Sequence, residues 1–444
     1  MFSSNYKKHF RENFILAYPV VLSQLGHIMV SVADSIMVGQ LGTLPLAAAS
    51  LGNSLFTVIM VFGLGLSFGI TPLVASADGR KNQKRISLLL INGVLVSSVA
   101  GILLYLLGYL ITPLLPHLNQ PEPVVALAIP YVHLLCFSML PLMVFQGFRQ
   151  FAEGLSLTRQ AMYISVLANA LNVVGNYMLI YGKWGAPAWG LNGAAVSTVI
   201  SRIIMAFIMG YFVIKSETLR PYRLRWKKKF ISVSHMFRIL KLGLPISMQM
   251  IFEVGAFSFS AVMIGWLGAK QLAAHQIAIN IAAVTYMMAG GIAAAATIRV
   301  GKLFGKGQLS EMRAAGYSSL LMAMAFMTTS GLLLILLKNV IPQFYVQDPE
   351  VIQIASGLLV VAAFFQLSDG VQVVGLGALR GLEDVKLPSL VSLLAYWVVA
   401  LPIGYVLGFV FKLGAPGIWT GLLFGLTVAA ILLFLRFRKL SLKK

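Results

Sequence analysis

Apolar residues fill this chain in long runs, and short polar segments separate one run from the next. Each run has about 20 residues or more, the length that a helix needs to cross the hydrocarbon core of a bilayer. The pattern therefore predicts an all-α polytopic membrane protein. Its twelve spans are expected at 14–40, 46–76, 86–112, 124–148, 160–181, 190–214, 241–266, 272–298, 314–337, 350–378, 387–409 and 416–435.

The composition agrees with this interpretation. Of the 444 residues, 59% are apolar and 11% are charged, and the mean hydropathy is +0.87. No soluble domain of this length has enough interior to hide so much apolar surface. The polar, basic N-terminus precedes a long apolar run, which indicates a retained first span rather than a cleaved signal peptide. The single cysteine, Cys136, excludes an intramolecular disulfide and a cysteine-based metal cluster.

The positive charges lie mainly on one side of the predicted spans. Of the 34 Lys and Arg residues, 29 lie in the two tails and in the loops of one side, four lie in the opposite loops, and Arg202 lies inside the sixth span. This asymmetry predicts that both termini are cytoplasmic. The net charge of +21 thus reflects topology and indicates no nucleic-acid partner. The basic segment 220–229 leaves open a contact with acidic lipid headgroups.

The chain contains an internal repeat with an offset of 226 residues. "SIMVGQLGTLPLAAAS" (35–50) aligns without a gap on "AVMIGWLGAKQLAAHQ" (261–276). Six spans per half keep both halves in one orientation, related by a pseudo-twofold axis along the membrane normal. We therefore expect an N-terminal lobe at 1–214, a basic cytoplasmic linker at 215–240 and a C-terminal lobe at 241–444. Two similar six-helix lobes are an architecture for alternating access.

Three of the thirteen acidic residues, Asp34, Glu253 and Asp369, lie deep inside predicted spans. A carboxylate at mid-bilayer costs about 2.5–3.5 kcal/mol on insertion scales and is tolerated where it faces a bundle interior or a wet cavity. The repeat does not duplicate these acids, because Asp34 aligns with Ser260 and Glu253 aligns with His27. Residues that only packed helices together would be expected in both copies, so the acids indicate function.

Other polar side chains accompany the acids at helical spacing on spans one, five, seven, eight and ten. They include His27, Asn169, Asn172, Asn176, Ser260, His275, Gln276, Asn280, Gln366 and Gln372. Polar stripes also hold membrane helices together, so the asparagine stripe of span five admits a packing role as well as a functional one. Pro19, which precedes Asp34 in span one, predicts a position where that helix can bend.

The deep carboxyl groups suggest ion-coupled transport. A desolvated carboxyl group can hold a proton, a sodium ion or a cationic organic molecule. An antiporter works in this way: ion and substrate compete for one charged site, and access to that site alternates between the two sides of the membrane. The sequence has no Walker GxxxxGK[ST] motif, which argues against ATP-driven transport, and no HExxH or CxxC motif. We therefore expect a transporter and not an enzyme.

The duplicated layout, "ADSIMVGQLG" in the first span and "GWLGAKQLAAHQIAIN" after the seventh resemble multidrug and toxic compound extrusion (MATE) transporters over essentially the whole chain. The three deep acids are similar to those of the NorM-type bacterial branch, which exports cationic drugs and dyes in exchange for Na⁺ or H⁺. The resemblance implies a transporter of the bacterial inner membrane, with drugs and membrane lipid as partners. We expect a monomer with no cofactor beyond the coupling ion.

The resemblance also implies two cation sites, and it does not distinguish Na⁺ from H⁺. The N-lobe site would comprise Asp34, Asn172, Asn176, Ala194 and Thr198. The C-lobe site would comprise Glu253, Asp369, Tyr286 and Phe257. The substrate cavity would be lined by His27, Gln276, Asn280, Gln366 and Gln372.

Two other functions remain open. A flippase for a lipid-linked oligosaccharide precursor belongs to the same superfamily, but such flippases usually have strongly cationic cavities. Here Arg202 is the deep basic residue, set against three deep acids. An intramembrane hydrolase would use Glu253 and Asp369 as its acid pair, but the chain lacks a duplicated YD or GxGD motif. Both observations favour a cation-coupled exporter.

Overall fold

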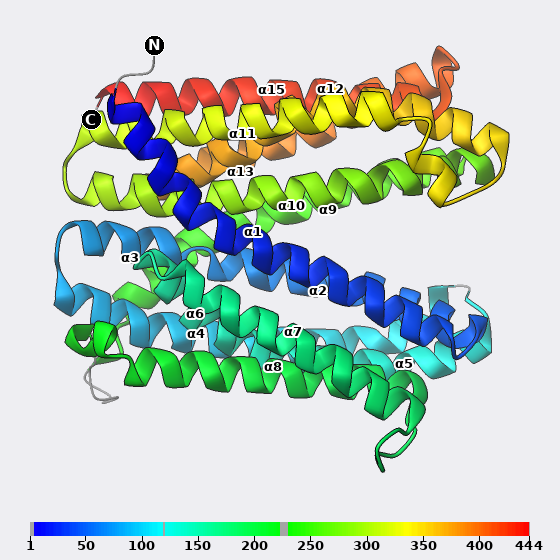
Figure 1. The fold of residues 1–444 in the computed structure, drawn as a ribbon, viewed down its shortest axis with the longest axis horizontal. Helices are drawn as coiled ribbons and strands as arrows, with labels where there is room; N and C mark the ends of the chain where they lie inside the picture. Colours follow the sequence, from blue (N-terminus) through cyan, green and yellow to red (C-terminus); the bar gives the residue numbers. More distant parts are fainter. Residues whose placement is uncertain (1–3, 119, 223–229, 444) are drawn as a thin grey trace. The chain divides into compact units, whose positions relative to one another are not determined.

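The computed structural model describes residues 4–118, 120–222 and 230–443 (Figure 1). These residues are largely helical, and no strand occurs among them. Twelve helical segments in this part of the chain are long and apolar enough to cross a membrane. The chain is therefore a multi-pass membrane protein, and the predicted all-α class with twelve spans is confirmed.

Each half of the chain contains six of the twelve candidate spans. The first half contains α1 (Ser4–Gly39), α2 (Thr43–Ser67), α3 (Ile70–Gly79), α4 (Gln83–Ile111), η1 (Thr112–Leu118), α5 (Glu122–Phe137), α6 (Met139–Gly154), α7 (Thr158–Tyr181), α8 (Gly190–Lys215) and η2 (Glu217–Tyr222). The second half contains α9 (Val233–Gly265), α10 (Ala269–Gly305), α11 (Leu309–Leu337), η4 (Ile341–Phe344), α12 (Pro349–Gly381), α13 (Lys386–Leu393), η5 (Leu394–Ala400), α14 (Leu401–Tyr405), η6 (Val406–Val410) and α15 (Gly414–Lys443).

The internal repeat is visible in the helix bounds. Helix α4 covers Gln83–Ile111 and α11 covers Leu309–Leu337, so both ends differ by the 226 positions found in the sequence. The repeated Leu-Gly step places Gly42 and Gly268 at φ angles of 123° and 114°, a region that L side chains rarely adopt. The duplicated frame that follows Asp34 thus encodes a turn between two helices.

The chain forms two compact units. The N-terminal unit is Leu22–Ser247, and the C-terminal unit is Met1–Val21 together with Met248–Lys444. These units differ from the expected lobes, because the start of α1 belongs to the C-terminal unit and the start of α9 belongs to the N-terminal unit. Of the expected linker 215–240, residues 223–229 lie outside the described part of the chain.

The two exchanged segments end at equivalent positions of the repeat. Val21 and Ser247, the last residues of the exchanged segments, are 226 positions apart. Two residues before each of them stands a proline, Pro19 in α1 and Pro245 in α9. Both helices continue through their proline, so the structure keeps α1 and α9 as single helices across the change of unit.

Two glycines let the exchanged segments approach closely. A Cβ atom at Gly291 of α10 would lie 2.4 Å from Val21 Cγ2, and one at Gly65 of α2 would lie 2.6 Å from Ser247 Cα. Gly65 and Gly291 are again 226 positions apart. Small residues permit such close packing between membrane helices.

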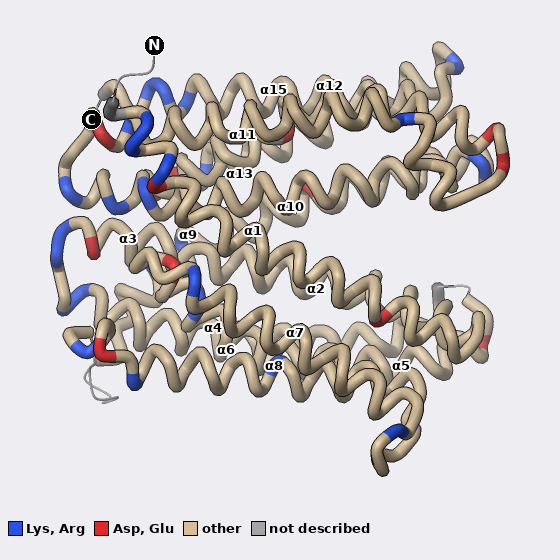
Figure 2. The backbone as a smooth tube through the Cα atoms, viewed as in Figure 1, with Lys and Arg blue, Asp and Glu red and all other residues tan. Residues whose placement is uncertain are grey.

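Charged residues gather at the helix ends. Figure 2 shows that, within each unit, Lys and Arg are concentrated at one end of the helices. The start of α1 and the end of α15 lie at that end (Figure 1). The distribution agrees with the asymmetry counted along the sequence.

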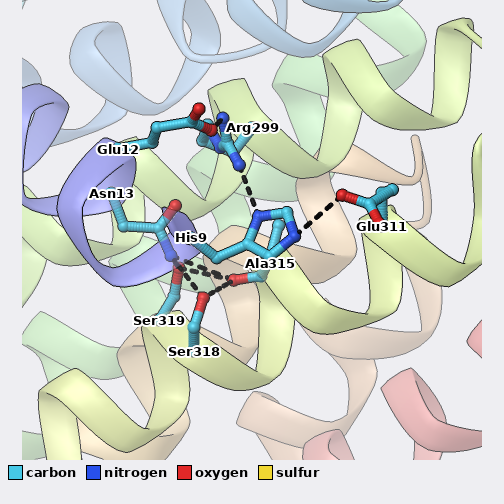
Figure 3. Close-up of polar contacts among 8 residues, drawn as sticks. All are labelled: His9, Glu12, Asn13, Arg299, Glu311, Ala315, Ser318 and Ser319. Carbon is cyan, nitrogen blue, oxygen red and sulfur yellow. Dashed lines mark hydrogen bonds and ion pairs between the residues drawn. The ribbon is translucent and has the colours of Figure 1, made fainter. Parts of the chain in front are cut away.

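A polar cluster holds the start of α1 within the C-terminal unit (Figure 3). The buried Asn13 Nδ2 donates to Ser318 Oγ and Ser319 Oγ of α11, each at 2.8 Å, and to Ala315 O at 3.1 Å. These bonds fix one face of α1 on α11. The sequence analysis did not single out this contact.

His9 extends the same cluster to α10 (Figure 3). Arg299 Nη2 lies 2.6 Å from His9 Nδ1, and His9 Nε2 lies 3.1 Å from Glu311 Oε2. Arginine can only donate, so His9 Nδ1 accepts and the ring carries its proton on Nε2, which donates to Glu311. Arg299 also pairs with Glu12.

Asn13→Ala should destabilise the protein, because it removes all three of these hydrogen bonds from a buried position. We expect the free energy of unfolding to fall by roughly 1–3 kcal/mol. Thermal unfolding of the purified protein in detergent measures the change. Asn339→Ala, at an exposed position, is the matched control. Equal melting temperatures for the two variants would show that the Asn13 contacts do not stabilise the fold.

Candidate functional site

In the N-terminal unit, Asp34 on α1 faces the asparagine stripe of α7. Asn172 and Asn176 are one helical turn apart, so they share one face. Asn176 Nδ2 donates to Asp34 Oδ1. With its amide nitrogen turned toward the carboxylate, Asn172 donates to Asp34 Oδ1 at 3.2 Å and accepts from the Thr198 backbone N–H at 3.2 Å. The stripe thus supplies two amide donors to one carboxylate.

Helix α8 completes this group. Thr198 Oγ1 donates to Ala194 O at 3.0 Å, and the Asn172 contact joins both residues to the carboxylate. The structure therefore brings together all five residues that the resemblance assigned to the N-lobe site. Asn176 Oδ1 is buried with no hydrogen-bond partner among the described residues. An amide can present either its oxygen or its nitrogen, so Asn176 suits both a protonated and an ionised Asp34.

Arg202, one turn after Thr198 on α8, is a buried cation of the same unit. Its Nη1 donates to Ser138 Oγ at 2.5 Å, and its Cζ lies 5.0 Å from the centroid of the Phe56 ring. Arg202 interacts electrostatically with Asp34. His27, also on α1, is exposed and lies near Asn169 of α7. In the N-terminal unit, the acidic side chain of Asp34 and the basic side chain of Arg202 thus both lie within spans.

In the C-terminal unit, Glu253 on α9 and Asp369 on α12 form a second acidic group. Their side chains are only 4% and 3% exposed, and their charges act on each other. Tyr286 of α10 interacts with both acids. Glu253 Oε1 is buried with no hydrogen-bond partner among the described residues. Two buried carboxylates repel unless a proton or a cation neutralises one of them, so the group is suited to bind a cation.

A π-helical stretch adds Tyr396 to this group. Tyr396 lies in η5, is fully buried, interacts with Glu253 and donates to Gln372 Oε1 at 2.9 Å. The Phe257 ring centroid lies 6.0 Å from that of Tyr396. π-Helical segments occur often at functional sites. All four residues assigned to the C-lobe site therefore lie around one acidic cluster.

The predicted cavity residues are placed unequally. Gln276 and Asn280 are exposed, and Gln276 donates to Asn280 at 3.0 Å. Gln372 and Gln366 are buried instead, at 0% and 1% exposure. Gln372 supports Tyr396, and both amide atoms of Gln366 lack a hydrogen-bond partner among the described residues. These two glutamines thus belong to the interior of the C-terminal unit.

Three residues of this cluster were not among the predicted site residues: Tyr396, Gln249 and Arg380. Arg380 Nη2 donates to Gln249 Oε1 at 2.9 Å, and Gln249 Nε2 lies 3.5 Å from Glu253 Oε2. The four-residue spacing from Gln249 to Glu253 was the available signal. Arg380 had been counted with the loop charges, because it stands near the end of its span. Arg380, half-buried at the end of its helix, is thus a second basic residue whose guanidinium contacts the protein interior.

Among the described residues, no group of three or more His, Cys, Asp or Glu side chains could hold a metal ion. A monovalent cation needs fewer charged ligands, and both clusters offer carboxylate, amide or hydroxyl oxygens.

Comparison with known proteins places these two clusters in a wider context. The family model described as MatE matches residues 19–178 and 245–406, one stretch in each half. The chain is 34% identical to the multidrug resistance protein MdtK of Yersinia pseudotuberculosis over 438 residues, covering 97% of this chain and 95% of that protein. It is 33% identical to MdtK of Photorhabdus laumondii, with the same coverage.

Solved structures show the same fold. The MATE transporter VcmN of Vibrio cholerae in its bent form superposes with a TM-score of 0.89 at 18% identity, covering 99% of each chain. A MOP superfamily transporter from Pyrococcus furiosus, described as having a binding pocket of reversed polarity, gives a TM-score of 0.89 at 21% identity over 100% of each chain. At these identities the likeness shows the fold, so the substrate must be argued from the residues.

Proposed function

Because the chain belongs to the MatE family of transporters, we propose that it exports cationic or amphiphilic organic compounds in exchange for Na⁺ or H⁺. The observation that carries the proposal is one buried or half-buried acidic cluster in each unit: Asp34 with Asn172 and Asn176, and Glu253 with Asp369. The MdtK relatives are named for multidrug resistance, which supports drugs as the substrate class.

In the proposed cycle, a carboxylate holds the coupling ion on one side of the membrane and a cationic substrate on the other. Ion binding neutralises the negative charge, which weakens attraction for the drug and releases it. Drug binding in turn favours release of the ion. Access alternates through rearrangement of the two units. No covalent chemistry is required, so we propose a transporter and not an enzyme, with no cofactor beyond the ion.

The proposed location is the cytoplasmic membrane of a bacterium, with both termini in the cytoplasm. The one-sided distribution of Lys and Arg supports this orientation. We propose that the protein acts as a monomer with small cationic compounds and membrane lipid as its partners.

A lipid-linked oligosaccharide flippase is the second candidate. The guanidinium groups of the buried Arg202 and the half-buried Arg380 favour it, because an anionic cargo would need cations in the protein interior. Each of these guanidinium groups interacts with an acidic residue of its own unit. This pairing keeps the export of cations as the better-supported function.

Ethidium transport in proteoliposomes tests the proposal under separately imposed Na⁺ and H⁺ gradients, with the membrane potential held at zero. If one ion is exchanged per drug, a 100-fold gradient of the coupling ion should support up to about a 100-fold ethidium gradient, because both correspond to about 2.7 kcal/mol. Liposomes without protein are the control. No response to either gradient would contradict coupled drug export and favour the flippase.

A further inference from the structure

The acidic cluster of the C-terminal unit contains a built-in cation. Arg380, in the last turn of α12, reaches Gln249 Oε1 at 2.9 Å, and Gln249 Nε2 lies 3.5 Å from Glu253 Oε2. Gln249 is 3% exposed, and Arg380 Nε is buried. A single amide therefore separates the guanidinium from the carboxylate. Arg380 interacts electrostatically with Glu253 and Tyr286.

The internal repeat provides a second, independent observation. Around the shared Gly-Leu pair the offset of the repeat is 227 residues, so "AEGLS" (152–156) at the end of α6 aligns with "LRGLE" (379–383) at the end of α12, and Arg380 corresponds to Glu153. Glu253 corresponds to His27. The C-terminal half thus has Glu253 on its first helix and Arg380 at the end of α12. At the equivalent positions, the N-terminal half has His27 and Glu153. Glu153 pairs with Arg149 of its own helix, whereas Arg380 extends to Gln249, the neighbour of Glu253, so these two positions of the repeat bring an acid and a guanidinium together in the C-terminal half only.

The charges of the cluster can be balanced in only one simple way. The charged groups that face Glu253 are Asp369 and Arg380, both from α12. The hydroxyls of Tyr286 from α10 and Tyr396 from η5 also face it and are neutral. Two carboxylates and one guanidinium leave one net negative charge when all three are ionised. Net charge in a low-dielectric interior is costly, so one monovalent cation or one proton completes the cluster.

We infer that Arg380, positioned by Gln249, is the fixed counter-charge of this cluster and limits it to one coupling cation. Without Arg380, the same two carboxylates would need two cations for neutrality. Arg380 does not bind the ion itself; it sets how many ions the carboxylates bind. The inference rests on the proposed cation-coupled transport and adds its stoichiometry at this site.

The experiment counts the ions exchanged per drug. Full-length protein is reconstituted with the membrane potential held at zero, and the ethidium gradient at which net flux stops is measured against the imposed gradient of the driving ion. When the logarithm of the ethidium gradient is plotted against the logarithm of the ion gradient, the slope gives the number of ions exchanged per drug. Arg380→Gln should raise the slope by one, and Asp369→Asn should lower it by one. Combining both changes should restore the original slope.

Two further variants separate charge from structure. Arg380→Lys keeps the positive charge and should leave the slope unchanged. Arg313→Gln removes a positive charge from the same unit at a site where the guanidinium contacts Ser441 O, and it should also leave the slope unchanged. For a variant that binds ions but does not transport the drug, the number of bound ions is measured directly on the purified protein. The measurement uses ²²Na⁺ where Na⁺ is the driving ion and proton uptake where H⁺ is.

The outcomes are distinct. An unmodified protein with no slope for either ion would overturn the proposed coupled transport. A normal slope that neither Arg380→Gln nor Asp369→Asn changes would overturn the inference about Arg380 alone. If Arg380→Gln does not fold, the cation count of Asp369→Asn tests the inference. No cation bound at the C-terminal cluster of this variant would support Arg380 as the counter-charge of Glu253. One cation bound there would overturn it, because Glu253 would then still need an ion.

Discussion

Asp34→Asn is expected to abolish ion-driven drug export while the protein still folds. The amide has the size of the carboxyl group and can still hydrogen-bond to Asn172 and Asn176. It has no negative charge to offer a proton, a sodium ion or a cationic drug. A 100-fold ion gradient that sustains up to about a 100-fold ethidium gradient in the unmodified protein should therefore sustain none in the variant.

Ethidium efflux from proteoliposomes measures this change. Size-exclusion chromatography of the detergent-solubilised protein shows whether the variant folds. Asp348→Asn is the matched control, because Asp348 lies outside the spans and its capping bond to the Glu350 N–H can be kept by asparagine. A folded Asp34→Asn protein that exports ethidium at the normal rate would contradict a role for Asp34 in transport.

Glu253→Gln is expected to weaken the ion dependence of export without removing all transport. The substitution leaves one carboxylate, Asp369, and one guanidinium, Arg380, so the cluster has no net negative charge to attract a cation. Coupling between two binding events typically amounts to 5- to 150-fold in affinity, and we expect ion stimulation to fall by about that factor. The export rate, measured against the concentration of the driving ion, reports the change.

Glu122→Gln, at an exposed position in the first turn of α5, controls for the loss of a carboxylate elsewhere. Full ion stimulation in Glu253→Gln would place the coupling in the N-terminal unit, at Asp34. Loss of stimulation in Glu253→Gln but not in Glu122→Gln would make the C-terminal cluster a coupling site.

The sequence predicted the spans and singled out the three deep acids, and the reason is physical. A membrane span needs a long apolar run, so each helix could be found from local composition. A deep acid is costly, so Asp34, Glu253 and Asp369 stood out against their neighbours. The asparagine stripe was found because it repeats at helical spacing on one helix, and the resemblance to MATE transporters assigned Asn172 and Asn176 to Asp34.

The partners of Glu253 were harder to predict, because they come from helices far away in the chain. Tyr396 is 143 positions from Glu253 and sits in a π-helical stretch whose register an α-helical pattern does not give. Arg380 stands where a loop charge would stand, and only the folded contact with Gln249 shows that its guanidinium points inward. Likewise, the exchange of the starts of α1 and α9 depends on tertiary packing that no local pattern encodes.

That exchange bears on how such a protein could have arisen by duplication. Val21 and Ser247 end the exchanged segments at equivalent positions, so each half gives its first segment to the other half and receives the equivalent one. A half-length ancestor with this geometry would lack the segment that Asn13 and its neighbours provide, and a second copy could supply it reciprocally. Such an ancestor would be a domain-swapped homodimer. The present chain then corresponds to that dimer with its two subunits joined end to end.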